Sequence, residues 1–73
     1  MRTLVLISVE DATGQRCVDI LRGEQGFGWC ECRRDPEDPR GWSRLAPIMW
    51  GFASRRDAVA AARDSTGWME TGA

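Results

Sequence analysis

Hydrophobic and polar positions follow a helical period in the last third of the chain. The apolar stripe at this spacing is formed by Ala58, Val59, Ala61 and Ala62. Ser54 stands at an N-cap position, with Asp57 three residues later as the acidic partner of a capping box. Gly67 suits the left-handed C′ position, and Trp68 follows where a contact back onto the last turn is expected. A stripe made mostly of alanine buries little area, so the pattern predicts a helix lying close against a sheet.

Earlier apolar runs indicate strands. Residues 4–7 are continuously apolar, residues 11–14 read as a turn, and a strand is predicted over residues 48–52, with Pro47 at its edge or beginning. Residues 16–22 fit either a strand or two helical turns that end at Gly23. We favour the strand, because residues 23–26 followed by the run 27–32 predict a hairpin. Residues 33–41 contain two prolines and read as a polar loop.

The length of that hairpin loop predicts its register. If residues 23–26 form an even-length loop, Cys17 lies opposite Cys32, Val18 opposite Glu31, and Ile20 opposite Trp29. Side chains alternate across a strand, so one face of the hairpin carries Val18, Ile20, Phe27 and Trp29. The opposite face carries Cys17, Asp19, Leu21, Cys30 and Cys32. The first face is the better core, and we expect the helix to cover it.

These elements predict an α+β fold: a small antiparallel sheet of three to four strands with one C-terminal helix packed on one face. We expect residues 1–73 to form a single domain of marginal stability, with residues 69–73 as a frayed tail. Residues 1–9 are interpreted as a strand and not as a signal peptide, because the apolar run stops at two acidic residues. No run has the length of a membrane span, and a cytoplasmic location is expected.

Several short motifs resemble those of a group of small uncharacterised proteobacterial proteins. They are residues 16–20 (RCVDI), 27–29 (FGW), 33–38 (RRDPED), 41–42 (GW) and the segment 52–62, which begins FAS and ends in an alanine-rich helix. The resemblance covers about residues 16 to 68 and implies a hairpin, a polar loop and a helix. It implies no activity. Cys30 and Cys32 stand where that group usually has acidic and aromatic residues, so any thiol chemistry would belong to this chain alone.

The three cysteines have three interpretations. They can act as small hydrophobic residues, which we favour for a reduced domain. Cys17 and Cys32 could form a cross-strand disulfide, which an intracellular location disfavours. Three thiolates and Asp19 could hold a metal ion, although structural zinc sites more often space their cysteines C-x₂₋₄-C. We therefore predict no metal and no cofactor. Without His or Lys to lower its pKa, a nucleophilic cysteine is disfavoured, and no catalytic residue is predicted.

Charge and aromatic residues suggest a second kind of surface. The net charge is −1, and all ten basic residues are arginine. A candidate nucleic-acid interface would consist of Arg33, Arg34, Arg40, Trp42 and Arg44, combining a stacking platform with phosphate-binding groups. The alternative is that these arginines pair with the three acidic residues between positions 35 and 38. Arg55 and Arg56 stand at the helix N-terminus, where basic residues are unfavourable, so they are either solvated or kept for a partner.

A two-layer domain of this size leaves one sheet face uncovered, and such a face commonly marks an association surface. We expect that face to carry Cys17, Leu21, Cys30 and Cys32, together with one side of residues 4–7. The leading hypothesis is a non-enzymatic protein-interaction module that forms a homodimer or docks on another protein. The alternative is a nucleic-acid-binding domain that uses the arginines and Trp42.

Overall fold

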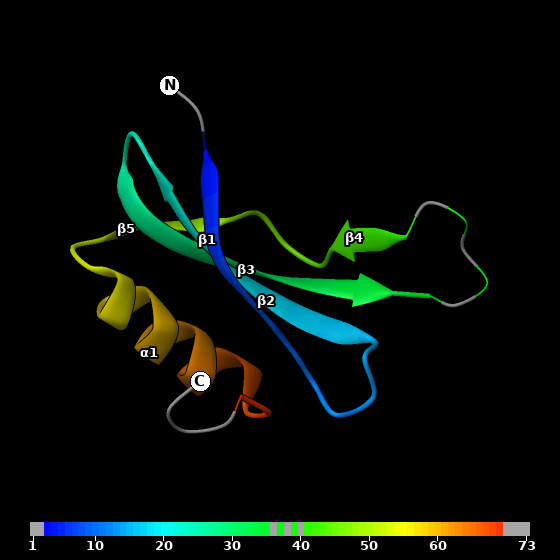
Figure 1. The fold of residues 1–73 in the computed structure, drawn as a ribbon. Coiled ribbons are helices and arrows are strands. Elements are labelled where there is room, and N and C mark those ends of the chain that lie inside the picture. Colours follow the sequence, from blue (N-terminus) through cyan, green and yellow to red (C-terminus); the bar gives the residue numbers. More distant parts are fainter. Residues whose placement is uncertain (1–2, 36, 38, 40, 70–73) are drawn as a thin grey trace.

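The computed structural model describes residues 3–35, 37, 39 and 41–69 of the chain. In chain order its elements are β1 Leu4–Glu10, β2 Arg16–Gly23, β3 Gly26–Arg34, β4 Trp42–Arg44, β5 Met49–Phe52 and α1 Arg55–Thr66 (Figure 1). All strand pairs are antiparallel. The predicted α+β class and the C-terminal helix are confirmed. The described residues form five strands, however, because the segment 42–52, expected to hold one strand, forms β4 and β5, and β3 extends to Arg34, into the predicted loop.

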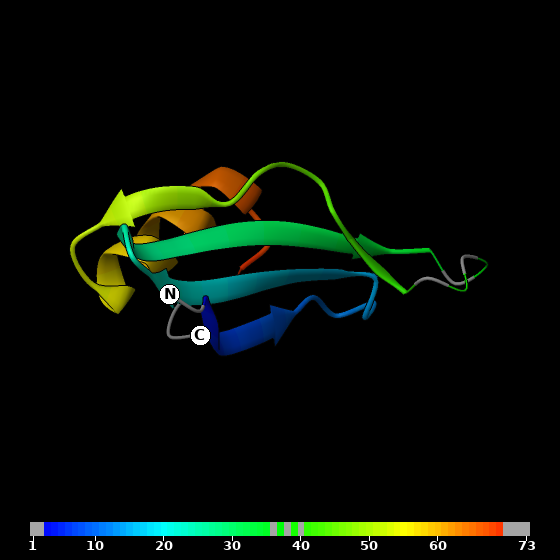
Figure 2. The same ribbon diagram turned by 90° about the horizontal axis from the view of Figure 1, so that it is seen from above.

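The sheet is a three-stranded meander whose last strand has two partners. β1 pairs with β2, and β2 pairs with β3. The other edge of β3 is shared: β4 pairs with residues 32–34, and β5 pairs with residues 27–29. Figure 2 shows β1 at one edge of the sheet and β5 alongside β3 at the other. Among the described residues, β1 therefore has a neighbouring strand on one side only.

The predicted hairpin register is confirmed. Cys17 lies opposite Cys32, Val18 opposite Glu31, and Ile20 opposite Trp29. Residues 16–23 form a strand, so the helical alternative for this segment was wrong. We call the side of β2 and β3 with Val18, Ile20 and Trp29 the helix face. The cysteine face is the opposite side, with Cys17, Leu21, Cys30 and Cys32.

The ends of α1 are capped as predicted. The Ser54 side chain accepts a hydrogen bond from the backbone N–H of Asp57 at 3.1 Å. Gly67 is left-handed, with a φ of 73°, and its N–H donates to the carbonyl of Arg63. Trp68 uses its ring nitrogen instead, donating to Oε2 of Glu31 at 2.7 Å. That contact fastens the end of the helix segment to β3.

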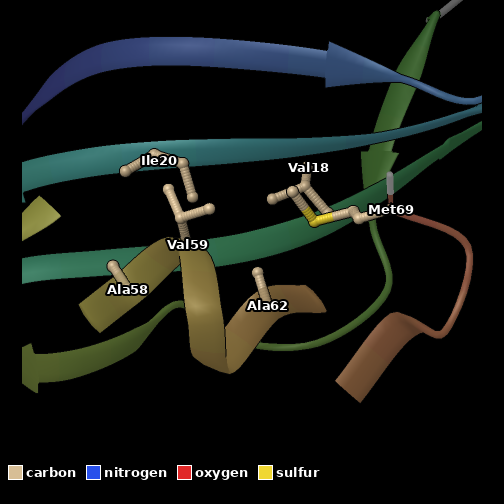
Figure 3. Packing of buried hydrophobic residues seen from close by; sticks show 6 residues of the cluster. All are labelled: Val18, Ile20, Ala58, Val59, Ala62 and Met69. Carbon is tan, nitrogen blue, oxygen red and sulfur yellow. The ribbon is translucent and has the colours of Figure 1, made fainter. Parts of the chain in front are cut away.

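The helix face holds the larger apolar core. Fully or nearly fully buried side chains from the sheet and the helix meet there: Val18, Ile20, Ala58, Val59, Ala62 and Met69 (Figure 3). The small side chains Ala58 and Ala62 let the helix backbone approach the strands closely. Met69 was expected in the frayed tail, but it is only 7% exposed and packs against this core. Residues 70–73 of that predicted tail lie outside the described part of the chain.

The cysteine face is also covered, which corrects the expectation of an open sheet face. Cys17, Leu21, Cys30 and Cys32 are between 2% and 6% exposed. The cover comes from Ile48 and Trp50, which the chain brings back over β2 and β3 as it enters and forms β5. A Cβ atom on Gly28 would lie 2.8 Å from the Trp50 ring, and one on Gly23 would lie 2.9 Å from it. These two glycines form the flat surface on which the indole rests.

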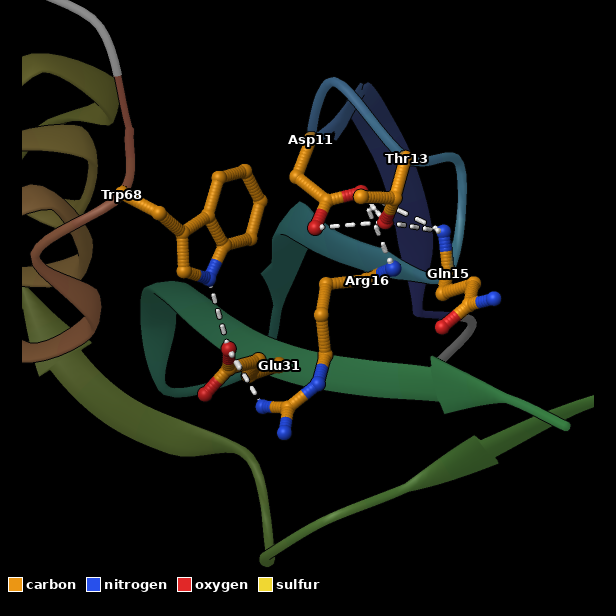
Figure 4. A network of polar contacts seen from close by, with 6 residues as sticks. All are labelled: Asp11, Thr13, Gln15, Arg16, Glu31 and Trp68. Carbon is orange, nitrogen blue, oxygen red and sulfur yellow. Dashed lines mark hydrogen bonds and ion pairs between the residues drawn. The ribbon is translucent and has the colours of Figure 1, made fainter.

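A polar network links the β1–β2 turn to the end of the helix segment. Asp11 Oδ1 accepts hydrogen bonds from the Thr13 hydroxyl and from the backbone N–H groups of Gln15 and Arg16 (Figure 4). Arg16 in turn pairs with Glu31 at 3.3 Å, the carboxylate that also accepts from Trp68. The predicted turn over residues 11–14 is therefore an Asp-centred turn.

Candidate functional site

Three thiols and one carboxylate occupy neighbouring positions on the cysteine face. We refer to Cys17, Asp19, Cys30 and Cys32 as the Cys₃Asp cluster. Cys17 and Asp19 are two residues apart on β2, and their partners across the ladder are Cys32 and Cys30. Alternation along each strand directs all four side chains to the same face. The cluster is thus a two-by-two array on adjacent strands.

The distances within the cluster are short. The sulfurs of Cys30 and Cys32 are 4.0 Å apart, and the Cys17 sulfur lies 3.9 Å from Oδ1 of Asp19. One donor atom from each of Cys17, Asp19 and Cys32 lies within 4.8 Å of the other two. The same Asp19 oxygen accepts a 2.6 Å hydrogen bond from the Ser8 hydroxyl on β1. All three cysteines are free thiols.

Burial controls the acidity of these thiols. Loss of solvation, followed by the negative charge of Asp19, raises the pKa of Cys17 to about 11. Loss of solvation and the neighbouring Cys32 raise the pKa of Cys30 to about 11 as well, while the Arg44 cation acts in the opposite direction. Loss of solvation also raises the pKa of Cys32, with Cys17 as the next cause. At neutral pH the three thiols are therefore protonated and poorly nucleophilic.

A different region, the outer edge of β1, presents apolar side chains to solvent. Leu4, Val5 and Leu6 are 54%, 55% and 39% exposed. No charged residue occurs between Leu4 and Val9. The pairing of β1 with β2 is interrupted by a bulge between Val5 and Ile7. Of the apolar surface predicted for association, this strand is the part that remains accessible.

A groove runs between β1 and α1 on the helix face. The helix packs over β2, β3 and β5 (Figure 1). The groove has a volume of about 450 Å³ and is lined by Ile7, Arg55, Arg56, Val59, Ala60 and Arg63. Arg55 and Arg56 are exposed, whereas Nε of Arg63 is buried and has no hydrogen-bond partner. Within the described residues no carboxylate forms an ion pair with these three arginines.

The predicted nucleic-acid residues lie on the arm of the sheet formed by β3 and β4. Arg34 lies opposite Trp42, and its guanidinium stacks 5.3 Å from the indole centroid. Arg44 lies opposite Cys32, so it shares the cysteine face with Arg34 and Trp42, whereas Arg33 belongs to the other face. Arg40 lies outside the described residues. The structure brings three of the five residues to one face.

Comparisons with protein-family models, curated proteins and solved structures give no match for this chain. No helix in the described part of the chain has the length and apolar character needed to span a bilayer. Arg55 and Arg56 were recognised from the sequence, but Arg63 was not. Its spacing of seven residues from Arg56 places both on one side of a helix, and that spacing could have revealed the groove.

Proposed function

We propose that this chain is a non-enzymatic interaction module that binds an extended, acidic segment of another protein along the outer edge of β1. The observation that carries the proposal is an edge strand with three consecutive exposed apolar residues, Leu4 to Leu6, and no charged residue before Glu10 at its end. Natural edge strands are usually protected by charges or proline, and an unprotected edge readily accepts another strand. The bulge after Val5 restricts the registers that such a strand can adopt.

The arginine-lined groove supports an acidic partner. A strand added to β1 would direct alternate side chains toward the helix face, above the groove that borders Ile7. There they would meet Arg55, Arg56 and Arg63, whose positive charges have no acidic partner within the described residues. Aspartate or glutamate at alternate positions would complement these charges. Charge complementarity at such a surface contributes mainly to selectivity and to the rate of association.

The same charges disfavour a second copy of this chain as the occupant. Two β1 strands could pair about a two-fold axis. An axis perpendicular to the sheet would place both helices on the same side of the joined sheet, whereas an axis in the plane of the sheet would place them on opposite sides. With the axis perpendicular to the sheet, both sets of three arginines would border the new junction. Like charges brought together in this way oppose association. A partner that supplies carboxylates is therefore the better match.

Selection from a displayed library of random peptides tests the proposal. The selected peptides should alternate apolar and acidic residues, and their affinity should fall with increasing salt. Val5→Lys should weaken binding by blocking the edge, and Arg56→Glu should weaken it by reversing the groove charge. Ser65→Ala, an exposed substitution elsewhere on α1, serves as the matched control.

Two results would contradict this function. One is a library that yields no binder, or binders that neither Val5→Lys nor Arg56→Glu affects. The other is a stable dimer in light scattering that Val5→Lys converts to a monomer, because a second copy would then be the occupant of the β1 edge.

A second candidate function is nucleic-acid binding by the β3–β4 arm. It is favoured by the exposure of Arg33, Arg34 and Arg44 and by the lack, within the described residues, of ion pairs between them and Asp35 or Glu37. Against it, Arg34 already occupies one face of the Trp42 ring. Titration with single- and double-stranded oligonucleotides at several salt concentrations tests it. Affinity that is absent at low salt would eliminate this function, because phosphate contacts strengthen as salt falls.

A further inference from the structure

We propose that the Cys₃Asp cluster is a binding site for one zinc ion, held between β2 and β3. The array supplies four donors of the types that bind zinc: three sulfurs and one carboxylate oxygen. It uses none of the side chains that line the groove, and its one contact with β1 is the hydrogen bond from Ser8 to Asp19. The proposal therefore stands or falls separately from the proposed interaction.

Cys17, Asp19 and Cys32 already lie close enough together to bind one ion, and Cys30 would complete the site from beside Cys32. Zinc–sulfur bonds of about 2.3 Å place two sulfurs about 3.8 Å apart in a tetrahedron. The Cys30 and Cys32 sulfurs are already 4.0 Å apart. The donor atoms of Cys17, Asp19 and Cys32 lie within 4.8 Å of one another. The centre of such a triangle is at most about 2.8 Å from each atom, because 4.8 Å divided by √3 is about 2.8 Å. Each donor then needs to move by about 0.5 Å to reach bonding distance.

The C-x-C spacing of Cys30 and Cys32 suits a metal site on a β-strand, although structural zinc sites more often have C-x₂₋₄-C. In helices and loops, C-x₂₋₄-C brings two sulfurs to one ion. On a strand, residues two apart share a face, so Cys30-x-Cys32 is the spacing that directs two sulfurs to one side. Cys17 and Asp19 repeat this spacing on the neighbouring strand, in register. Two adjacent strands in register therefore bring the ligands together here, as a C-x₂₋₄-C turn does in most structural zinc sites.

The surroundings have the features of a metal-ligand shell. Ser8 donates a 2.6 Å hydrogen bond to Asp19, in the way that outer groups orient ligating carboxylates. Ile48 and Trp50 exclude water from the sulfurs, while the half-buried Asp19 lies on the side open to solvent. Arg44, across from Cys32, offsets part of the negative charge that three thiolates would bring. Because the thiols are protonated at neutral pH, binding would release protons and become tighter as pH rises.

The test is titration of the reduced full chain with zinc and with cobalt(II), which reports its ligands by absorption. We expect one ion per chain, an intense sulfur-to-cobalt charge-transfer band, and a rise in the melting temperature with zinc. Cys30→Ser should abolish part of the charge-transfer band and weaken binding at least tenfold. Asp19→Cys should give a four-sulfur site with a stronger band, which a structural role for Asp19 alone would not produce.

Two further variants sharpen the outcome without removing a ligand. Ser8→Ala should weaken zinc binding by about 10- to 100-fold, as expected for an outer-shell group. Ser65→Ala, on the exposed side of the helix, should leave it unchanged. The proposal is overturned if reduced wild-type protein binds no zinc more tightly than free cysteine does. It is equally overturned if cobalt gives an octahedral spectrum without sulfur bands, or if Cys30→Ser binds as well as wild type.

Discussion

The two faces of the β2–β3 hairpin are both closed, but by different means. On the helix face, Ala58, Val59 and Ala62 bring a capped helix onto Val18 and Ile20. The cysteine face lacks a helix. There a single returning strand supplies Ile48 and Trp50, and the indole rests on two glycines.

The helix face and the cysteine face are both buried, but they bury different kinds of side chain. The helix face is closed mainly by aliphatic side chains. On the cysteine face, β2 and β3 carry three thiols and Asp19. A carboxylate beside buried thiols raises the pKa of Cys17 and so opposes its ionisation. This is the array for which we propose a zinc ion.

Removing the cover of the cysteine face should have the largest effect on stability. Trp50→Ala is expected to lower the free energy of unfolding by about 3 kcal/mol, because it deletes a large aromatic side chain and leaves the thiols open. Denaturant unfolding measures the loss, and thiol labelling should become faster. Trp42→Ala, at a ring that is 37% exposed, is the control and should cost less than 1 kcal/mol. Equal losses for the two variants would mean that Trp50 is not the cover.

Substitution of the glycines beneath the Trp50 indole should have the next largest effect on the free energy of unfolding. A Cβ on Gly28 would lie 2.7 Å from the Met49 carbonyl oxygen and 2.8 Å from the Trp50 ring, so β5 would have to move. Gly28→Ala is therefore expected to cost about 1–3 kcal/mol in urea unfolding. Gly23→Ala meets only the outer atoms of the same indole, which can shift, and should cost less. If Gly23→Ala costs as much as Gly28→Ala, the contact with the β5 backbone is not the limiting one.

The helix face can be weakened selectively at its cap. Ser54→Ala removes the acceptor of the Asp57 N–H and should cost about 1 kcal/mol in the free energy of unfolding. Thiol labelling should be much less affected than in Trp50→Ala, because the cover of the cysteine face remains. Ser65→Ala, an exposed change in the same helix, should alter stability by less than about 0.5 kcal/mol. Thiols that became as reactive as in Trp50→Ala would show that the two faces unfold together.

Local patterns in the sequence predicted the elements whose causes are local. Ser54, Gly67 and the alanine stripe fix the helix within a few residues of one another, and the hairpin loop fixes the β2–β3 register. The pairing of β4 and β5 with β3 depends on where a long polar loop returns, and no short pattern encodes that. The prediction of an open cysteine face was wrong, because no local pattern in the sequence indicates that Trp50 packs against the distant residues Gly23 and Gly28.

The Cys₃Asp cluster could be assembled from the register but not from cysteine spacing alone. Its four members became neighbours once Cys17 was placed opposite Cys32. The hydrogen bond from Ser8 could not be anticipated, since it depends on the β1–β2 register after a bulge. The groove beside β1 was likewise hidden, because its shape depends on which strands the helix covers.

The pH dependence of stability offers the finest distinction between the two faces. The chain has no His or Tyr, and all its basic side chains are arginine, so between pH 9 and pH 11 its cysteines are the side chains that titrate. An unperturbed thiol has a pKa of about 8.5, whereas in the fold the pKa values of Cys17 and Cys30 are raised to about 11. Above pH 9 the unfolded chain therefore loses protons that the fold retains, and metal-free stability should fall until about pH 11. A difference of one full proton between the folded and unfolded states changes the free energy of unfolding by about 1.4 kcal/mol per pH unit, and each thiol contributes less than this.

Cys17→Ala should make the decline of stability with pH shallower in urea unfolding. Ser54→Ala should lower stability at every pH and leave the slope unchanged. A stability that stays constant from pH 9 to pH 11 would mean that the thiols are solvated, and the cysteine face would then not be closed.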